Sequence, residues 1–264
     1  MSNRIEERLK QLQEKKEKAF ITYMTAGLPD MEGTKEIIRA QEEAGTDIIE
    51  LGIPFSDPIA DGPVIQQASY ESIQKGTNLK KVFAMVEELR KDCQVPLVFM
   101  MYYNTVLYYG LEAFAKKCAD CGVDGLIIPD LPFEEQGELQ AALDKTEGAP
   151  LLLQLVSPVS KDRIPMLLEN ARGFVYCVSS MGVTGQAADF HKNVASYLQQ
   201  VKSVSKIPVM MGFGIRQAAD VEKFGDYIDG AIVGSHFIKL MKECNYDKTV
   251  IQEYIRTFKK EMNA

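Results

Sequence analysis

The segment AGTDIIELG, residues 44–52, contains the pattern from which the fold is predicted. Gly45 is suited to end a helix, because glycine readily adopts the left-handed backbone conformation at which helices stop. The apolar run that follows is rich in β-branched residues and is typical of a strand buried on both faces. Similar segments recur at residues 121–128, CGVDGLII, and more loosely at residues 227–233, YIDGAIV. The pattern therefore predicts a repeated unit in which a buried strand follows a helix.

Short apolar runs of this kind follow one another along the chain, and there are eight. They cover Ala19–Met24, Asp47–Leu51, Pro96–Met101, Gly125–Ile128, Pro150–Val156, Gly173–Val178, Pro208–Met211 and Gly230–Val233. Segments with helical periodicity lie between them, including Glu36–Ala44, Leu79–Lys91, Leu111–Cys121 and Phe190–Ser203. The runs recur about every 30 residues, the size of one βα unit. Eight such units favour a closed barrel, with an open doubly wound sheet as the alternative that spacing alone leaves open.

The N-terminal segment predicts one further helix. Ile5, Leu9 and Leu12 recur at helical spacing among charged residues, which indicates an apolar stripe packed on the body of the fold. No Ser/Gly-rich linker or change in composition divides the chain of 264 residues. We therefore expect an α/β fold with one domain over residues 1–264, a (βα)8 TIM barrel with an extra N-terminal helix.

The composition narrows the class of protein. The 37 acidic residues exceed the 30 basic ones, for a net charge of -7, which argues against nucleic-acid binding. No apolar run approaches the length of a membrane span, and the charged N-terminus does not resemble a secretory signal. Five cysteines are an odd number that suits a reducing compartment, and two histidines make a zinc site improbable. We therefore expect a soluble cytoplasmic protein without a metal.

Two carboxylates in the segment 50–63, ELGIPFSDPIADGP, are candidates for acid–base chemistry. Glu50 interrupts an apolar strand at a position expected to point into the barrel mouth. A carboxylate there loses hydration and resists ionisation, so it can act as a general acid and then as the conjugate base. The alternative is a structural ion pair or hydrogen bond. Asp61 lies eleven residues further on, in a loop from which it could reach a bound ligand.

Glycine-rich turns follow the last three apolar runs. They are Gly182–Gly185 (GVTG), Gly212–Gly214 (GFG) and Gly234-Ser235. Glycines let backbone N–H groups approach an anion, and a helix N-terminus adds partial positive charge. Loops after the seventh and eighth strands are the usual phosphate site of a barrel. Together these turns predict a phosphate monoester ligand.

Several of these motifs match one known family. The segment 50–58, ELGIPFSDP, followed by residues 60–63, ADGP, closely resembles the signature of the tryptophan synthase α chain. The resemblance extends over nearly the whole chain, and the long loop motif is highly specific. It implies a (βα)8 barrel that cleaves indole-3-glycerol phosphate to indole and glyceraldehyde 3-phosphate by a retro-aldol reaction. It also implies that Glu50 exchanges protons with indole C3 and the glycerol hydroxyl, and that Asp61 accepts the indole N–H.

The resemblance also implies further site residues. Thr184 matches a residue on a mobile loop that closes onto Asp61, and Tyr176 matches a tyrosine near the glycerol chain. The positions that match the apolar surroundings of the indole ring are Tyr23, Met100, Ile127 and Leu153. The positions that match phosphate contacts are Gly185, Gly214, Gly234 and Ser235.

The family normally works in a complex with a β chain, and the expected assembly is an α2β2 tetramer. The pyridoxal phosphate cofactor is expected in that β chain, with none in this chain. The contact face would consist of Pro54–Pro63 with the segments at Asn104 and Pro132. Three alternatives stay open: a stand-alone indole-3-glycerol phosphate lyase, a different sugar-phosphate barrel such as an isomerase, and a non-catalytic activating subunit. The segment 50–63 argues against the isomerase, and the presence of both carboxylates argues against the last.

Overall fold

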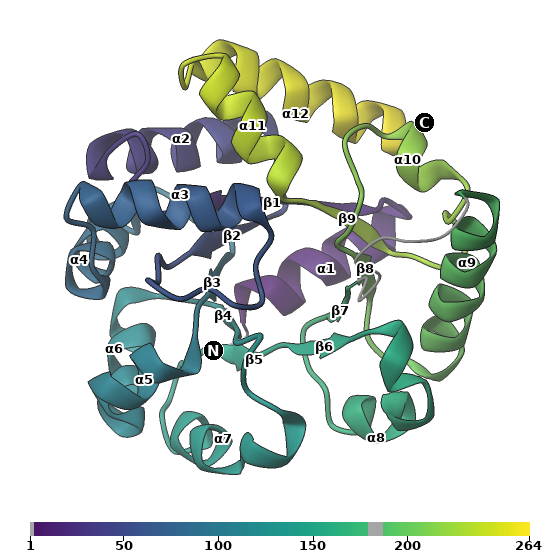
Figure 1. Ribbon diagram of the computed structural model, residues 1–264, viewed down its shortest axis with the longest axis horizontal. Coiled ribbons are helices and arrows are strands. Elements are labelled where there is room, and N and C mark those ends of the chain that lie inside the picture. Colours follow the sequence, from purple (N-terminus) through teal and green to yellow (C-terminus); the bar gives the residue numbers. More distant parts are fainter. Residues whose placement is uncertain (1–2, 179–186) are drawn as a thin grey trace.

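A ring of parallel strands forms the centre of the molecule (Figure 1). The computed structural model describes residues 3–178 and 187–264, without the side chains of residues 187–193. Its described strands are β1 (Ala19–Thr25), β2 (Ile48–Gly52), β3 (Leu97–Met100), β4 (Gly125–Ile127), β5 (Leu151–Leu152), β6 (Gln154–Val156), β7 (Val175–Cys177), β8 (Val209–Met211) and β9 (Gly230–Val233).

The strand order shows how this ring closes. Neighbouring strands follow the order β5-β4-β3-β2-β1-β9-β8-β7-β6, and all described pairs are parallel. The two strands at the ends of this order, β5 and β6, are halves of the single predicted run Pro150–Val156, separated only by Leu153. The closed barrel is therefore confirmed over an open sheet, with one of its eight predicted strands divided in two.

Helices surround this ring on the outside (Figure 1). They are α2 (Met31–Ala44), α3 (Pro63–Gln74), α4 (Leu79–Leu89), α5 (Tyr103–Tyr109), α6 (Leu111–Cys121), α7 (Gly137–Asp144), α8 (Ile164–Leu168), α9 (Ala187–Val204), α10 (Ala219–Glu222), α11 (Ser235–Glu243) and α12 (Lys248–Met262), with 3-10 turns at Phe133–Glu135 and Pro158–Arg163. The sequence predicted a later start for α2, because the cap formed by Asp30, whose side chain accepts from the N–H of Gly33, lies outside the apolar periodicity. None of the described helices is both long and apolar enough to cross a membrane.

The N-terminal helix α1 (Arg4–Lys15) lies across one end of the ring (Figure 1). Its buried residues Ile5, Leu9 and Leu12 belong to the same apolar cluster as the inward side chains of the strands. A Cβ added to Gly125, at the start of β4, would come within 2.9 Å of Ile5. The predicted stripe therefore packs at the N-terminal end of the strands, which leaves the opposite end for the loops that carry the candidate site residues.

An aspartate before the strand stabilises the N-terminal end in three units. Each carboxylate accepts a hydrogen bond from a backbone N–H near the start of the neighbouring strand, and each is paired with a cation. The bonds run from Phe20 to Asp47 (2.8 Å), from Leu97 to Asp124 (2.9 Å) and from Val209 to Asp229 (2.7 Å). The aspartate of the repeated sequence pattern is thus a structural group that joins adjacent strands.

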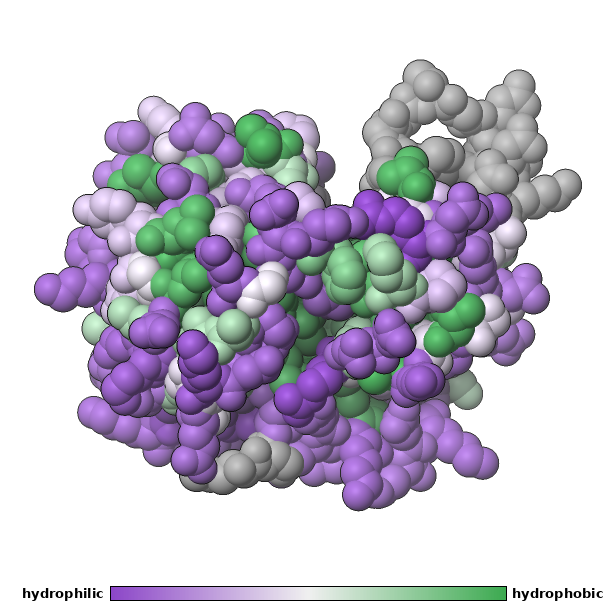
Figure 2. All heavy atoms as spheres, turned by 90° about the horizontal axis from the view of Figure 1, so that it is seen from below, coloured by the Kyte–Doolittle hydropathy of each residue, from purple (hydrophilic) through white to green (hydrophobic). Residues whose placement is uncertain are grey.

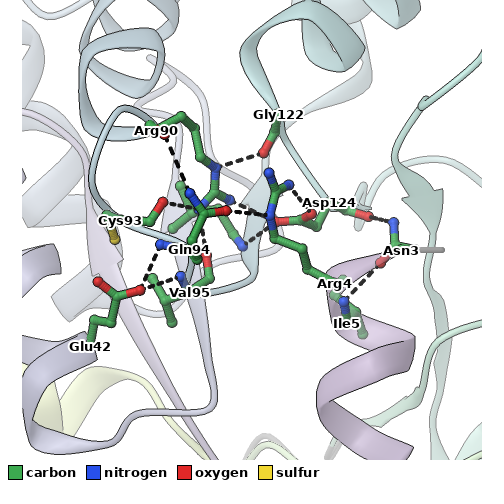
Figure 3. A network of polar contacts seen from close by, with 11 residues as sticks. Asn3, Arg4, Ile5, Glu42, Arg90, Cys93, Gln94, Val95, Gly122 and Asp124 are labelled. Carbon is green, nitrogen blue, oxygen red and sulfur yellow. Dashed lines mark hydrogen bonds and ion pairs between the residues drawn. The ribbon is translucent and has the colours of Figure 1, made fainter. Parts of the chain in front are cut away.

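Figure 3 shows one of these three networks, around Asp124. Arg4 and Arg90 contact its two carboxylate oxygens at 2.9 and 2.7 Å. The guanidinium of Arg90 also donates to the backbone carbonyls of Gly122 and Val95. These bonds tie α1, α4 and the end of α6 to the barrel, and the buried charges compensate one another.

Candidate active site

Glu50 is the charged residue that the described barrel interior encloses most completely. Side chains alternate between the two faces of a strand, so Glu50 shares the inward face of β2 with Ile48, which belongs to the interior cluster. In the sheet register it lies between Tyr23 of β1 and Val98 of β3. The carboxylate thus faces into the barrel, as the sequence predicted.

The surroundings of Glu50 keep its carboxyl group neutral. Its exposed fraction is 0%, and neither carboxylate oxygen has a hydrogen-bond partner among the described residues. Burial without compensation raises the pKa of Glu50 to about 8. The alternative of a structural ion pair or hydrogen bond is wrong within the described part of the chain. A carboxyl group with a pKa near neutrality can both donate and accept a proton.

Asp61 is the second carboxylate of the site and has a different environment. It is partly buried in the loop after β2, and its Oδ2 accepts a hydrogen bond of 3.0 Å from the hydroxyl of Tyr102. Burial raises the pKa of Asp61 to about 6, although the bond from Tyr102 acts in the opposite direction. Asp61 is therefore largely ionised at neutral pH, whereas Glu50 is largely protonated.

Sequence reasoning did not assign a role in the site to Tyr102. The residue lies 41 positions from Asp61, and no periodicity connects the two. The one available signal was its place directly after an apolar run, where barrel side chains turn toward the site.

Two tyrosines lie close to both carboxylates. Burial raises the pKa of Tyr23 and of Tyr176, and the charges of Glu50 and Asp61 raise both further. Each phenol ring lies against a glycine backbone. A Cβ at Gly52 would come within 2.0 Å of the Tyr23 hydroxyl, and one at Gly212 within 2.2 Å of the Tyr176 ring. Glycines at the ends of β2 and β8 therefore make room for rings from other strands.

The remaining apolar candidates also lie at the inward face of the barrel. Ile127 and Leu153 are buried in the interior cluster, and the partly buried Met100 packs against it. Met100 and Ile127 are register partners on adjacent strands. The apolar side chains expected around an aromatic ring thus come from neighbouring strands of the barrel and point into its interior.

The described phosphate candidates lie in loops at the same end of the barrel. Gly214 is exposed, has a φ of +68°, and has nothing within 4 Å of an added Cβ. Gly234 immediately precedes Ser235, the first residue of α11, and its added Cβ would lie 3.9 Å from the Cβ of Tyr23. The N-terminus of α11 therefore lies beside the tyrosine that neighbours Glu50. The other two candidates, Thr184 and Gly185, lie outside the described residues.

A groove of about 1690 Å³ lies elsewhere, between the end of α6, the residues just before β4, helix α7 and strand β5. Figure 2 views the molecule from the side of α7 and shows a hollow with a partly hydrophobic floor. The residues that line this groove include neither Glu50 nor Asp61. Its size therefore does not identify it as the site of the chemistry.

A βα-barrel with two carboxyl groups of raised pKa is typical of one class of protein, the barrel enzymes. Comparison with known proteins identifies the family. The family model for the tryptophan synthase alpha chain matches residues 9–264. The tryptophan synthase alpha chain of Lachnospira eligens is 65% identical over 263 residues, which cover 99% of this chain and 100% of that protein. The one from Alkaliphilus metalliredigens is 45% identical, covering 98% and 97%.

Solved structures agree with this result. Tryptophan synthase subunit alpha from Legionella pneumophila superposes with a TM-score of 0.89 at 30% identity, covering 99% of both chains. A structure of Mycobacterium tuberculosis tryptophan synthase gives a TM-score of 0.88 at 32% identity, covering 100% of both chains. The chain belongs to the tryptophan synthase alpha chain family, and its reaction is the lyase cleavage of indole-3-glycerol phosphate.

Proposed function

We propose that Glu50 performs both proton transfers of the cleavage. The neutral carboxyl group donates its proton to C3 of the indole ring. The carboxylate so formed removes the proton of the hydroxyl on the adjacent glycerol carbon. The bond between that carbon and C3 then breaks, its electron pair returns to the ring, and indole and glyceraldehyde 3-phosphate are released. The observation that supports this role is the buried carboxyl group of Glu50, which has no partner among the described residues.

We propose that Asp61 stabilises the cationic ring that forms when C3 is protonated. Its carboxylate is largely ionised at neutral pH, and it would accept a hydrogen bond from the indole N–H. Because their environments differ, the two carboxyl groups have different roles: Glu50 stays protonated until it reacts, and Asp61 stays charged. Thr184, outside the described residues, would contact Asp61 when its loop closes.

The phosphate and the ring fix the position of the substrate in this proposal. Backbone N–H groups at Gly214, Gly234 and Ser235 would hold the phosphate, together with Gly185 outside the described residues. The first turn of α11 adds its partial positive charge. The indole ring would lie among apolar groups and two phenol rings. These residues are Tyr23, Met100, Ile127, Leu153 and Tyr176.

Indole formation by a Glu50→Gln variant tests the catalytic proposal. The amide keeps the shape of the side chain but cannot deliver a proton to carbon, so the rate of indole release should fall by about 10²–10⁴-fold. Binding of unreacted indole-3-glycerol phosphate should change little, because the phosphate contacts come from other strands. Turnover close to that of the parent chain would remove Glu50 from the mechanism.

We further propose that the chain is one domain in an α2β2 tetramer with a β chain, to which indole passes in the cytoplasm. The loop Pro54–Pro63 and the segments at Asn104 and Pro132 would form the contact face. Large apolar residues are exposed in or beside these segments: Ile59, Leu107, Tyr108 and Phe133. Pyridoxal phosphate would belong to the β chain, and the chemistry of this chain would rest on its own side chains.

Co-elution with a purified β chain tests the partnership. A stable complex with faster indole release is the expected result. Rapid turnover of the isolated chain with no binding to the β chain would instead indicate a stand-alone lyase. Binding to the β chain with no cleavage of indole-3-glycerol phosphate would indicate a non-catalytic activating subunit.

A further inference from the structure

Tyr102 joins the two loops that border the candidate site. It follows β3 directly and is buried, whereas Asp61 belongs to the loop that follows β2. We propose that Tyr102 is a positioning residue of the cleavage reaction: its hydroxyl fixes the Asp61 carboxylate so that one oxygen stays free to accept the indole N–H. This inference rests on the proposed role of Asp61 and adds a residue that acts through it.

The direction of the hydrogen bonds supports this assignment. The backbone N–H of Ala60 donates to the Tyr102 oxygen at 2.9 Å. A phenol has a single proton to donate, and Oδ2 of Asp61 accepts that hydrogen bond from the Tyr102 hydroxyl at 3.0 Å. The bonds to consecutive residues of one loop therefore fix both the phenol oxygen and the carboxylate. Among the described residues, no side chain donates a hydrogen bond to Oδ1 of Asp61, so this oxygen is the one available to the ring nitrogen.

The phenol ring is itself held by its neighbours. The rings of Phe55 and Tyr102 are stacked, with centroids 5.0 Å apart and planes inclined by 18°. Tyr102 is also the N-cap residue of α5, and the next backbone N–H, from Tyr103, donates to Oδ1 of Asp130 at 2.9 Å. The backbone and the ring of Tyr102 are thus both fixed before a substrate binds. Less conformational entropy is therefore lost when the transition state forms.

The charge of Asp61 should depend on Tyr102. Tyr102, from the segment after β3, presents its phenol to Asp61. Asp61 also interacts electrostatically with Tyr23 on β1 and Tyr176 on β7. Glu50 on β2 borders the same two tyrosines. Among these described groups, Tyr102 is the one with a hydrogen bond to Asp61, and that bond lowers the pKa of the carboxyl group. Its removal should raise that pKa, so activity should begin to fall at a higher pH during acidification.

The substitution Tyr102→Phe removes the hydroxyl and keeps the ring that stacks on Phe55. We expect kcat for indole formation to fall by about 10- to 100-fold, the effect of losing one hydrogen bond to a charged group. KM should change less, because the phosphate contacts are untouched. The acidic limb of the pH profile should shift to higher pH. Tyr70→Phe, on the exposed face of α3, is the matched control and should leave kcat unchanged.

A double-mutant cycle separates positioning from a general structural role. If Tyr102 acts through Asp61, then Tyr102→Phe should cost less than about 3-fold in an Asp61→Asn background. An equal loss of kcat in both backgrounds, or an unshifted pH profile in Tyr102→Phe, would overturn the proposal while leaving the role of Asp61 intact. Parental activity in Asp61→Asn alone would instead refute the proposed role of Asp61. Circular dichroism and urea unfolding of each variant confirm that a folded protein is compared.

Discussion

The burial of Glu50 has a consequence for stability that can be measured apart from catalysis. Its pKa rises from 4.5 to about 8 on folding, because the carboxylate loses water and gains no partner among the described residues. Below pH 4.5 the group is neutral in both the folded and the unfolded chain. As the pH rises from 4.5 to 8, only the unfolded chain ionises, so the stability of the fold decreases.

The substitution Glu50→Gln removes this penalty. A pH of 7 is about 2.5 units above the ordinary pKa of a glutamate, and each unit corresponds to about 1.4 kcal/mol. Burial of Glu50 therefore lowers the free energy of unfolding by about 3 kcal/mol at this pH. We therefore expect the variant to be more stable than its parent by up to about 3 kcal/mol at pH 7. The advantage should shrink below about 1 kcal/mol at pH 5, because that pH is only about half a unit above the pKa of the group in the unfolded chain.

Urea unfolding at pH 5, 6 and 7 measures this difference. The control is Glu253→Gln, on the exposed side of α12, which should show no pH-dependent gain. A Glu50→Gln variant that is no more stable than its parent at pH 7, or whose advantage is the same at pH 5, would refute the reasoning. The expected pairing of higher stability with lost activity is typical of a residue retained for its chemistry.

Three further substitutions test the packing and charges around the site. Gly52→Ala places a methyl group 2.0 Å from the Tyr23 hydroxyl, so it should cost about 1–3 kcal/mol in urea unfolding and slow indole formation, whereas Gly62→Ala, with open space around it, should do neither. Asp124→Asn leaves two arginines without their buried partner and should lower the free energy of unfolding by about 3–5 kcal/mol, with an unchanged KM in the surviving folded protein. Ser235→Asp sets a negative charge at the N-terminus of α11 and should raise KM for indole-3-glycerol phosphate at least about 10-fold; an unchanged KM would place the phosphate elsewhere.

The elements of the barrel were largely predictable from the sequence. A strand buried on both faces must be apolar throughout, so each unit is visible as a short run bounded by glycine, proline or aspartate. The limits of that pattern show at Leu153, where the fifth run divides into β5 and β6 without any change in polarity. Hydrogen bonding to neighbours, and not composition, sets where those two strands end.

The candidate site was predictable where a residue contradicts its local pattern. Glu50 stands out because a carboxylate interrupts an apolar strand, and the described interior leaves it unpartnered. Tyr102 does not contradict its local pattern, because an aromatic residue after an apolar strand is typical of the hydrophobic core. Its contact with Asp61 arises only when β2 and β3 lie side by side. The three-dimensional neighbourhood, which local spacing does not encode, therefore supplies the residue that sequence reasoning missed.

A crystal structure of the Glu50→Gln variant with unreacted indole-3-glycerol phosphate tests the arrangement of the substrate most directly. We expect C3 of the ring and the adjacent glycerol hydroxyl to lie beside the side chain at position 50, and the ring N–H to donate to Asp61. The phosphate should lie at the first turn of α11, on Gly234 and Ser235. A ring whose nitrogen faces position 50, or a phosphate bound away from α11, would contradict this arrangement.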